Sequence, residues 1–190
     1  MSNTKMISAM VATASMAFGF AQAVHAKSPV PGKPGTQNIV EIAASVNKQT
    51  GEFDYLLAAA TCDYFDGAIV ELLTGSDKRT LFAPTDAAFE ALQRKLGVTT
   101  PAPAVTCTLP QATVFNILAY HVTEGRRFSN SVFNKRSTKM VEMLNGQYIV
   151  TNPGLSINDN AGKTIKAVLP LVNINASNGV IHVIDGVLEP

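Results

Sequence analysis

Hydrophobic residues recur at helical spacing through the first half of the chain. The first such run follows Asn38, a residue type that favours the N-cap of a helix, and comprises Ile39, Ile42, Ala43 and Val46. In the run that follows Thr85 and Asp86, Phe89, Leu92 and Leu96 are expected on the inner face of a helix. The pattern predicts helices after Asn38, from Phe53 to about Cys62, from Asp66 to Gly75, after Thr85 and Asp86, and from Gln111 to Ala119.

Strand patterns dominate the second half. One short strand, Arg79–Ala83, comes earlier and ends at Pro84, because proline cannot donate to a β-ladder. From Tyr120 onward, short apolar runs are separated by turn residues such as Asn145-Gly146, a strong hairpin signal. The expected pairs are Lys139–Leu144 with Gln147–Thr151, Leu155–Asn158 with Thr164–Leu169, and Leu171–Ala176 with Val180–Ile184. Helices followed by strands predict an α+β fold, with helices packed against an antiparallel or mixed sheet.

The first 26 residues have the pattern of a signal peptide. Lys5 precedes a mostly apolar run, Met6–Ala21, and Val24-His25-Ala26 offers the small residues that signal peptidase needs. The run is short for a membrane span and a Pro- and Gly-rich segment follows at once, so cleavage is favoured over an uncleaved anchor. We expect a signal peptide at 1–26, a flexible linker at 27–37 and one domain at 38–190. The protein would be secreted or periplasmic, with no transmembrane span.

Charge and cysteine content limit the kinds of ligand and the cellular compartment expected for the protein. Cleavage after Ala26 removes Lys5 and leaves as many basic as acidic residues, so the mature chain is not a general binder of polyanions such as nucleic acid. Cys62 and Cys107 are an even pair in an exported chain, which favours a disulfide. It would close a loop of about 45 residues, for which the chain-entropy model gives about 4 kcal/mol. Two buried thiols and a metal pair are the alternatives, and neither CxxC nor clustered histidines support the metal.

Two blocks carry the strongest motif of the chain. Thr80–Phe89 predicts a strand that stops at a proline and becomes a capped helix, and Asn175–Asp185 predicts two strand pieces joined at Asn-Gly. Tyr120-His121 and the turn Leu144-Asn145-Gly146 lie between them. In this order the blocks resemble the signature blocks of fasciclin-type domains, over about Asn38 to Pro190.

The resemblance implies a β wedge or sandwich with helices on one flank, used for adhesion or cell-surface recognition and usually without a cofactor. The Tyr-His region is proposed as a receptor contact in animal members, which makes Tyr120 and His121 candidate partner-binding residues. Asn173 stands where the family often has an acid, so a charge-assisted contact is expected to be missing. Within the two blocks, we expect structural roles for four residues: Thr85, Asp86, His182 and Asp185.

The histidines and acids of these blocks permit two interpretations. His121 and His182 could form a catalytic or metal-binding pair, but neither has an acid or cysteine at metal-ligand spacing. The favoured interpretation is that both are partly buried and bonded to backbone. Asp86 and Asp185 could form an acid/base pair, although a helix cap and a turn residue are simpler roles, and the sequence has no G-x-S-x-G elbow. We expect that the protein is not an enzyme and binds neither a cofactor nor a metal ion.

Basic residues cluster after the Tyr-His pair with no acid among them. They are Arg126, Arg127, Lys135, Arg136 and Lys139, interleaved with Phe128 and Phe133. A solvated loop is the simplest interpretation, and a patch for anionic polysaccharide is the sharper one. The leading prediction is a monomeric, non-enzymatic adhesion module that binds a cell-surface protein, polysaccharide or matrix component. The alternatives are a binder of anionic polysaccharide through residues 126–139 and a hydrolase that uses a histidine.

Overall fold

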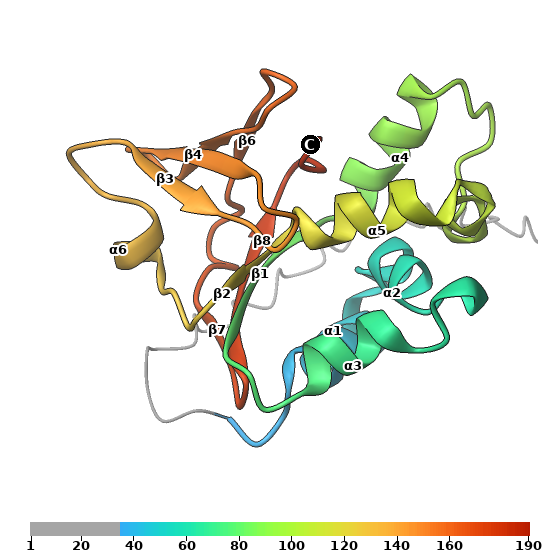
Figure 1. Ribbon diagram of the computed structural model, residues 1–190, viewed down its shortest axis with the longest axis horizontal. Helices are drawn as coiled ribbons and strands as arrows, with labels where there is room; N and C mark the ends of the chain where they lie inside the picture. The colour runs from blue at the N-terminus through green and yellow to red at the C-terminus, as the bar shows by residue number, and fades with distance from the viewer. Residues whose placement is uncertain (1–34) are drawn as a thin grey trace, which may run out of the picture.

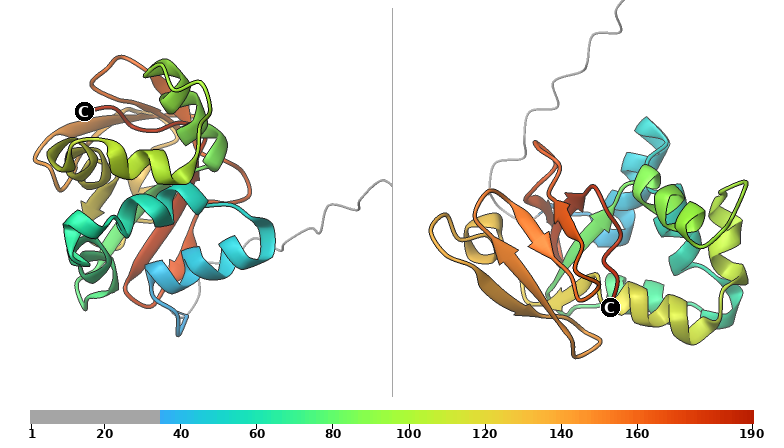
Figure 2. Two further views of the ribbon diagram at one scale, coloured as in Figure 1. Left: turned by 90° about the vertical axis from the view of Figure 1, so that its right-hand side faces the viewer. Right: turned by 90° about the horizontal axis from the view of Figure 1, so that it is seen from above.

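A computed structural model describes residues 35–190, which form three layers. Helices α1 to α5 lie on one side, a four-stranded sheet A lies in the middle, and a four-stranded sheet B lies on the other side (Figure 1). Two further views show the same order of layers (Figure 2). The fold is α+β, as the sequence predicts. The expected signal peptide and most of the expected linker lie outside the described residues.

Sheet A is a mixed sheet built around two parallel strands. Its order is β2 (Val122–Glu124), β1 (Arg79–Pro84), β8 (Gly179–Ile184) and β7 (Ile174–Ala176). β1 and β8 run parallel, with Thr80 opposite Val180 and Phe82 opposite His182, whereas β2 and β7 pair antiparallel with their neighbours. Parallel strands need a long crossover, and here it contains every element from α4 to β7.

Sheet B is an antiparallel meander. Its order is β3 (Lys139–Glu142), β4 (Tyr148–Asn152), β5 (Ser156–Asn158) and β6 (Thr164–Lys166). The β3–β4 connection turns at Gly146, which has a φ of +80°, a conformation that glycine adopts without a Cβ penalty. Both hairpins expected here from turn residues are confirmed, although the strands are shorter than the apolar runs suggested.

Both faces of sheet A are buried, so its central strands belong to two cores at once. Leu81 of β1 and Ile181 of β8 pack toward the helices. Phe82, one residue further along β1, and Ile184, three residues further along β8, pack toward sheet B. Successive side chains of a strand point to opposite faces, which explains the continuous apolar run in β8.

The five predicted helices are confirmed, with short helical turns between them. They are α1 (Ile39–Thr50), α2 (Asp54–Ala60), α3 (Ala68–Thr74), α4 (Asp86–Lys95) and α5 (Gln111–Ala119). The short turns are η1 (Asp63–Phe65), η2 (Pro103–Thr108) and α6 (Ser129–Val132). Asn38 begins α1 with a reciprocal capping box that it forms with Glu41. Within residues 35–190, no helix has both the length and the apolar character needed to cross a bilayer.

Two details of the helix prediction are wrong. Asp66 does not cap α3, because it ends the preceding turn η1 in the left-handed conformation and Gly67 takes the N-cap position. Leu96 is 55% exposed rather than inward-facing. The reason is that α4 ends at Lys95, and Gly97, with a φ of +86°, turns the chain there.

The predicted disulfide between Cys62 and Cys107 is present, with the Cα atoms 5.5 Å apart. It joins the end of α2 to η2, which lies in the proline-rich connection between α4 and α5. The buried amide of Gln93 holds the same connection by donating to the carbonyl oxygen of Ala102 at 2.9 Å and to Oγ1 of Thr106 at 3.2 Å. This long connection is therefore fixed to both α2 and α4.

Candidate interaction surface

The two signature blocks meet along β1 and β8, where a buried asparagine fixes the helices to the sheet. Oδ1 of Asn178 accepts the N–H of Ile39 at 3.0 Å, and its Nδ2 donates to the carbonyl oxygen of Leu73 at 2.7 Å. One amide thus ties the start of α1 and the end of α3 to the turn before β8. At the next residue, Gly179, an added Cβ would overlap the β1 backbone and the Ile39 side chain, so only glycine fits.

His121 joins α5 to the end of the chain. Its ring is 1% exposed, with Nδ1 2.7 Å from the Ile117 carbonyl oxygen and Nε2 2.9 Å from the Leu188 nitrogen. The Leu188 N–H only donates, so Nε2 accepts, Nδ1 carries the proton and the ring is neutral. Burial lowers the pKa of His121 to about 4. Both nitrogens are used, so this ring offers no atom to a substrate or a metal.

His182 connects sheet A to the loops that flank α6. Its Nε2 lies 2.9 Å from the Arg127 carbonyl oxygen, and its Nδ1 accepts the N–H of Asn173 at 3.3 Å. Asn173 accepts the N–H of Ser129 at 2.6 Å and donates to the Ser129 hydroxyl at 2.8 Å. The asparagine that departs from the family pattern thus makes a neutral contact with the start of α6. Burial lowers the pKa of His182 as well.

The Tyr-His pair does not contribute to the molecular surface. Tyr120 is 0% exposed, and its hydroxyl donates to the Tyr148 carbonyl oxygen at 2.8 Å and accepts the N–H of Asn160 at 3.2 Å. A receptor contact of the kind implied by the resemblance needs side chains that a partner can reach. The structure instead places Tyr120 and His121 in the core, so the expectation of a surface contact at this pair is corrected.

Thr85 and Asp86 cap two different helices. Oγ1 of Thr85 accepts the N–H of Ala88 at 3.3 Å and begins α4. The carboxylate of Asp86 reaches α2 instead, where it accepts the N–H groups of Asp54 and Tyr55 at 3.2 and 3.1 Å. Burial raises the pKa of Asp86, and nearby carboxylates add to this rise. Asp86 therefore has a cap role, as expected, but for a helix that precedes it in the chain.

Asp185 closes the free edge of sheet B. Its Oδ1 accepts the N–H of Lys166 at 2.7 Å, and its own N–H donates to the Lys166 carbonyl oxygen at 3.0 Å. Covering an edge in this way prevents strands of other chains from pairing there. Asp86 and Asp185 thus serve backbone groups in different layers, and this arrangement gives no support to an acid/base pair.

Three of the five clustered basic residues are used inside the molecule. Arg126 donates to two backbone carbonyl oxygens of the β7–β8 hairpin at 2.7 and 2.9 Å. Nε of Arg127 donates to the carbonyl oxygen of Glu124 at 2.8 Å, and Nζ of Lys139 to that of Ser131 at 2.6 Å. These contacts fix the 125–139 segment to its neighbours. Residues 126–139 therefore do not present one continuous cationic patch.

Lys135 and Arg136 keep their charged groups exposed, and neither group has a hydrogen-bond or ion-pair partner within residues 35–190. They stand at a hollow of about 480 Å³ beside α6, here called the α6 hollow. The residues that define it are Ser129, Asn130, Phe133, Asn134, Lys135, Arg136 and Leu155. Two cations, polar side chains and two apolar side chains suit an anionic ligand that also has an apolar part.

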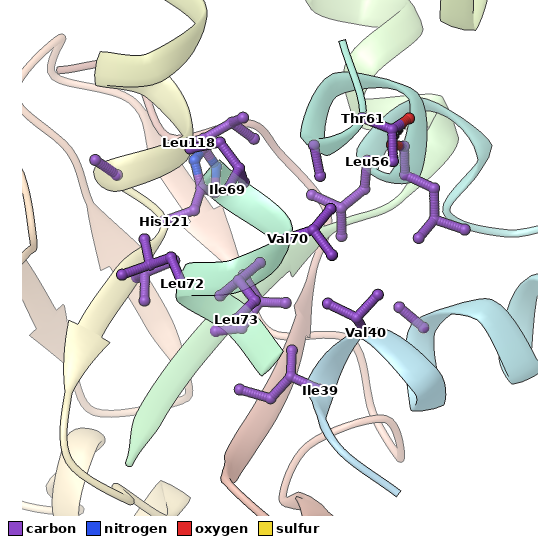
Figure 3. A pocket seen from close by; sticks show the side chains of 16 residues that line it. Ile39, Val40, Leu56, Thr61, Ile69, Val70, Leu72, Leu73, Leu118 and His121 are labelled. Carbon is purple, nitrogen blue, oxygen red and sulfur yellow. Dashed lines mark hydrogen bonds between the residues drawn. The ribbon is translucent and has the colours of Figure 1, made fainter. Parts of the chain in front are cut away.

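A second depression, between the helices, is part of the core. Figure 3 shows apolar side chains of α1, α2, α3 and α5 pointing into it, with Thr61 and His121 as the labelled residues that carry polar side-chain atoms. Its free volume is about 30 Å³, far below the several hundred Å³ typical of small-molecule sites. We therefore assign no ligand to it.

A model of the Fasciclin domain family matches residues 61–190. The chain belongs to this family. Two relatives from Synechocystis sp. match a larger share of the chain than residues 61–190. Protein sll1483 is 33% identical over 170 residues, which cover 86% of this chain and 81% of that protein. Protein sll1735 is 34% identical over 154 residues, which cover 80% of this chain and 96% of that protein.

The fold is also similar to a solved structure of a FAS1 domain pair from the insect cell adhesion molecule Fasciclin I. The TM-score is 0.52 at 13% identity, so the similarity concerns the fold alone. The match covers 81% of this chain and 51% of the insect chain, so this fasciclin domain spans about half the length of that pair. The fold expected from the signature blocks is thereby confirmed.

Fasciclin domains are generally non-enzymatic modules of the adhesion type and are typically extracellular. In the part of this fasciclin domain that the structure describes, no three His, Cys, Asp or Glu side chains gather as a metal ion would require.

Sequence patterns identified the two cations and Phe133 of the α6 hollow but not Leu155 or Ser129. Leu155 and Ser129 reach the hollow from the β4–β5 turn and from the start of α6, which no local pattern links. Pro153-Gly154 does signal the turn before Leu155, yet it gives no information about which residues the turn packs against.

Proposed function

We propose that this fasciclin domain is a secreted or periplasmic, non-enzymatic adhesion module that binds a component of a cell surface or matrix. One observation carries the proposal: the reactive side chains of the signature blocks, such as His121, His182 and Asp86, are all engaged in hydrogen bonds to backbone. A fold held in this way leaves recognition to exposed loops. The structurally similar insect protein is a cell adhesion molecule, which fits this role.

Binding to surface material tests the proposal. Purified mature protein is incubated with intact cells and with cell-envelope and matrix fractions of the source organism, and the bound fraction is measured against protein concentration. We expect saturable binding to at least one surface fraction, and no binding to the cytosolic fraction. Absence of saturable binding to every surface fraction would contradict the adhesion role.

Export is tested separately by the N-terminus of the protein. If cleavage follows Ala26, mass spectrometry of protein recovered from the periplasm or the medium should find Lys27 as the first residue. Protein found only in the cytosol, or still carrying residues 1–26, would contradict the proposed localisation.

The α6 hollow favours anionic polysaccharide as a second candidate ligand, because Lys135 and Arg136 have no partner among the described residues. Replacing both by Glu should abolish binding to a sulfated polysaccharide, whereas Lys48→Glu, an exposed cation on α1, should leave it unchanged. Binding of the unaltered protein should also weaken steeply as salt rises. A polysaccharide affinity that is the same in the double variant and the parent would eliminate this candidate.

A further inference from the structure

One loop concentrates exposed aliphatic side chains. Leu169 is 65% exposed and Leu171 is 37% exposed, and both belong to the segment Val168–Val172 between β6 and β7, here called the apolar loop. Pro170 between them is exposed as well, so three successive apolar residues face solvent. Scattered apolar residues are common on protein surfaces, but a contiguous apolar tip often marks an interaction site.

The apolar loop is held rigidly from behind. Its backbone pairs with β8, because Val168 donates its N–H to the Val183 carbonyl oxygen at 2.8 Å and Val183 donates its N–H to the Leu171 carbonyl oxygen at 2.9 Å. With its backbone fixed on β8, the loop keeps Leu169 outside the core. The exposure of its side chains therefore follows from the folded backbone.

Both ends of the apolar loop touch the α6 hollow. Just before the loop, Ala167 donates its N–H to the carbonyl oxygen of Leu155 at 2.8 Å, and just after it, Asn173 bonds to Ser129. Leu155 and Ser129 both line the hollow together with Lys135 and Arg136. The apolar tip and the two unpartnered cations thus belong to one continuous region of the surface.

The surrounding charges favour an anionic partner. Lys166, which precedes the loop, adds a further exposed cation beside the carboxylate of Asp185, which accepts the Lys166 N–H. Lys and Arg outnumber Asp and Glu from Tyr120 to Pro190, whereas acids outnumber bases from Gly35 to Ala119. The side of the molecule with α6 and sheet B, opposite α1–α3 in Figure 1, is therefore the more positive one.

We propose that the apolar loop and the α6 hollow form a docking surface for a lipid bilayer with anionic headgroups. Leu169 and Leu171 would enter the boundary between headgroups and acyl chains, while Lys135 and Arg136 pair with phosphate groups. A polysaccharide ligand would explain the two cations but not the exposed leucines. A lipid bilayer would explain both, so we favour lipid. The inference deepens the proposed adhesion function and rests on it, because a membrane is then the bound surface component.

Co-sedimentation with lipid vesicles tests the docking surface. The probes are phosphatidylcholine vesicles with and without phosphatidylglycerol at about one third of the lipid. Mature protein should bind the anionic vesicles and not the neutral ones. Lys135→Glu with Arg136→Glu should weaken binding at least about 30-fold, since each basic residue near an anionic surface contributes about a fivefold gain. Lys48→Glu, on the layer opposite sheet B, should change binding little.

The role of the two exposed leucines is tested by comparing their replacement with the replacement of a leucine elsewhere on the surface. Leu169→Ser with Leu171→Ser should reduce binding to anionic vesicles about tenfold or more. Leu96→Ser should not, although Leu96, at the end of α4, is 55% exposed, a value between those of Leu169 and Leu171. Exposed leucines contribute little to the core, and an unchanged melting temperature checks that each variant is folded.

A fluorescence measurement locates the contact. The chain contains no tryptophan, so Leu169→Trp introduces a single indole at the tip of the apolar loop. Its emission should shift to shorter wavelength when anionic vesicles are added, because the indole leaves water, whereas the emission of Leu96→Trp should not shift.

The outcomes separate this inference from the adhesion role itself. Loss of vesicle binding in both the leucine and the charge variants, with the controls intact, supports membrane docking. Binding to envelope fractions and sulfated polysaccharide without binding to vesicles would overturn the lipid inference and keep the adhesion function. Vesicle binding that survives the leucine replacements would also overturn it, and failure to bind any surface material would overturn both.

Discussion

Two buried histidines determine how this domain responds to acid. In each ring one nitrogen lies against a backbone carbonyl oxygen and the other accepts a backbone N–H, from Leu188 at His121 and from Asn173 at His182. Protonation would turn the accepting nitrogen into a donor that faces another donor. The folded state therefore disfavours the charged imidazole through burial and through geometry, and both pKa values lie below that of an ordinary histidine.

We expect the domain to lose stability in mild acid, mainly through His121. Its pKa is about 4 in the folded protein against 6.5 for an ordinary histidine, so between these values the unfolded chain binds more protons. The contribution is fully present above pH 6.5 and is lost as the pH falls toward 4. The total loss amounts to about 3 kcal/mol. Burial of His182 acts in the same direction. Urea unfolding at a series of pH values measures this slope.

His121→Gln provides the control for this prediction. Glutamine retains an amide that can donate and accept hydrogen bonds, but it does not titrate in this range. The variant should be less stable than the parent at neutral pH, and its free energy of unfolding should fall less steeply between pH 6.5 and 4. Equal slopes in the two proteins would assign the acid sensitivity to other groups.

At the scale of elements, local signals predicted most helices and hairpins. The cap of α1 depends on Asn38 and Glu41, three residues apart, and the β3–β4 turn depends on Asn145 and Gly146. Such signals need no knowledge of tertiary structure. The parallel pairing of β1 with β8 was not predicted, because the two strands lie far apart in the sequence and no local signal links them.

The interaction surface was predicted less well, because exposure depends on contacts between distant segments. Arg126 and Lys135 look equivalent in the sequence, yet the carbonyl groups that bind Arg126 belong to the β7–β8 hairpin. Leu169 was expected at the end of one strand and Leu171 at the start of the next, whereas in the structure both leucines lie between β6 and β7. Charge pattern could therefore locate the segment but not the residues that remain available to a partner.

The disulfide should make a large contribution to stability at this scale. The Cys62–Cys107 bond spans 45 residues and fixes η2 to α2. The chain-entropy model predicts a loss of about 4 kcal/mol when a loop of this length is opened. For a domain of this size, that corresponds to a fall in melting temperature of about 10 °C. Thermal unfolding followed by circular dichroism, with and without reducing agent, measures it.

A variant with both cysteines replaced by alanine separates loss of the bond from side effects of the reagent. Its melting temperature should match that of the reduced parent and should not change on addition of reductant. A reduced parent with two reactive thiols and an unshifted transition would show that Gln93 and the local packing hold η2 without the bond.

At the scale of the whole molecule, sheet A couples the helices to sheet B. Leu81 and Ile181 face one core, and Phe82 and Ile184 face the other. Loss of either outer layer would expose one full face of β1 and β8, at a cost of about 2 kcal/mol for each large apolar side chain. Neither half of the molecule therefore has a core that is complete without the other.

We therefore expect the helices and sheet B to unfold in a single transition. Far-UV circular dichroism reports mainly on the helices, and hydrogen exchange of the β4 and β5 amides reports on sheet B. The free energy of unfolding from the first should equal that of the slowest-exchanging amides from the second. A sheet B that exchanges at a much lower free energy than the helices would contradict this.

Two core variants test the coupling directly, because each removes volume from one core only. Ile157→Val alters the core between the sheets, and Leu56→Ala alters the core between the helices and sheet A. In a cooperative molecule, Ile157→Val lowers the protection of the slowest amides in α2 and in β5 by the same amount, about 1 kcal/mol. Leu56→Ala produces a larger loss, again shared by both layers. If Ile157→Val affected only sheet B, that sheet would open as a separate unit, and the pairing of β1 with β8 would be stabilised by the helical core alone.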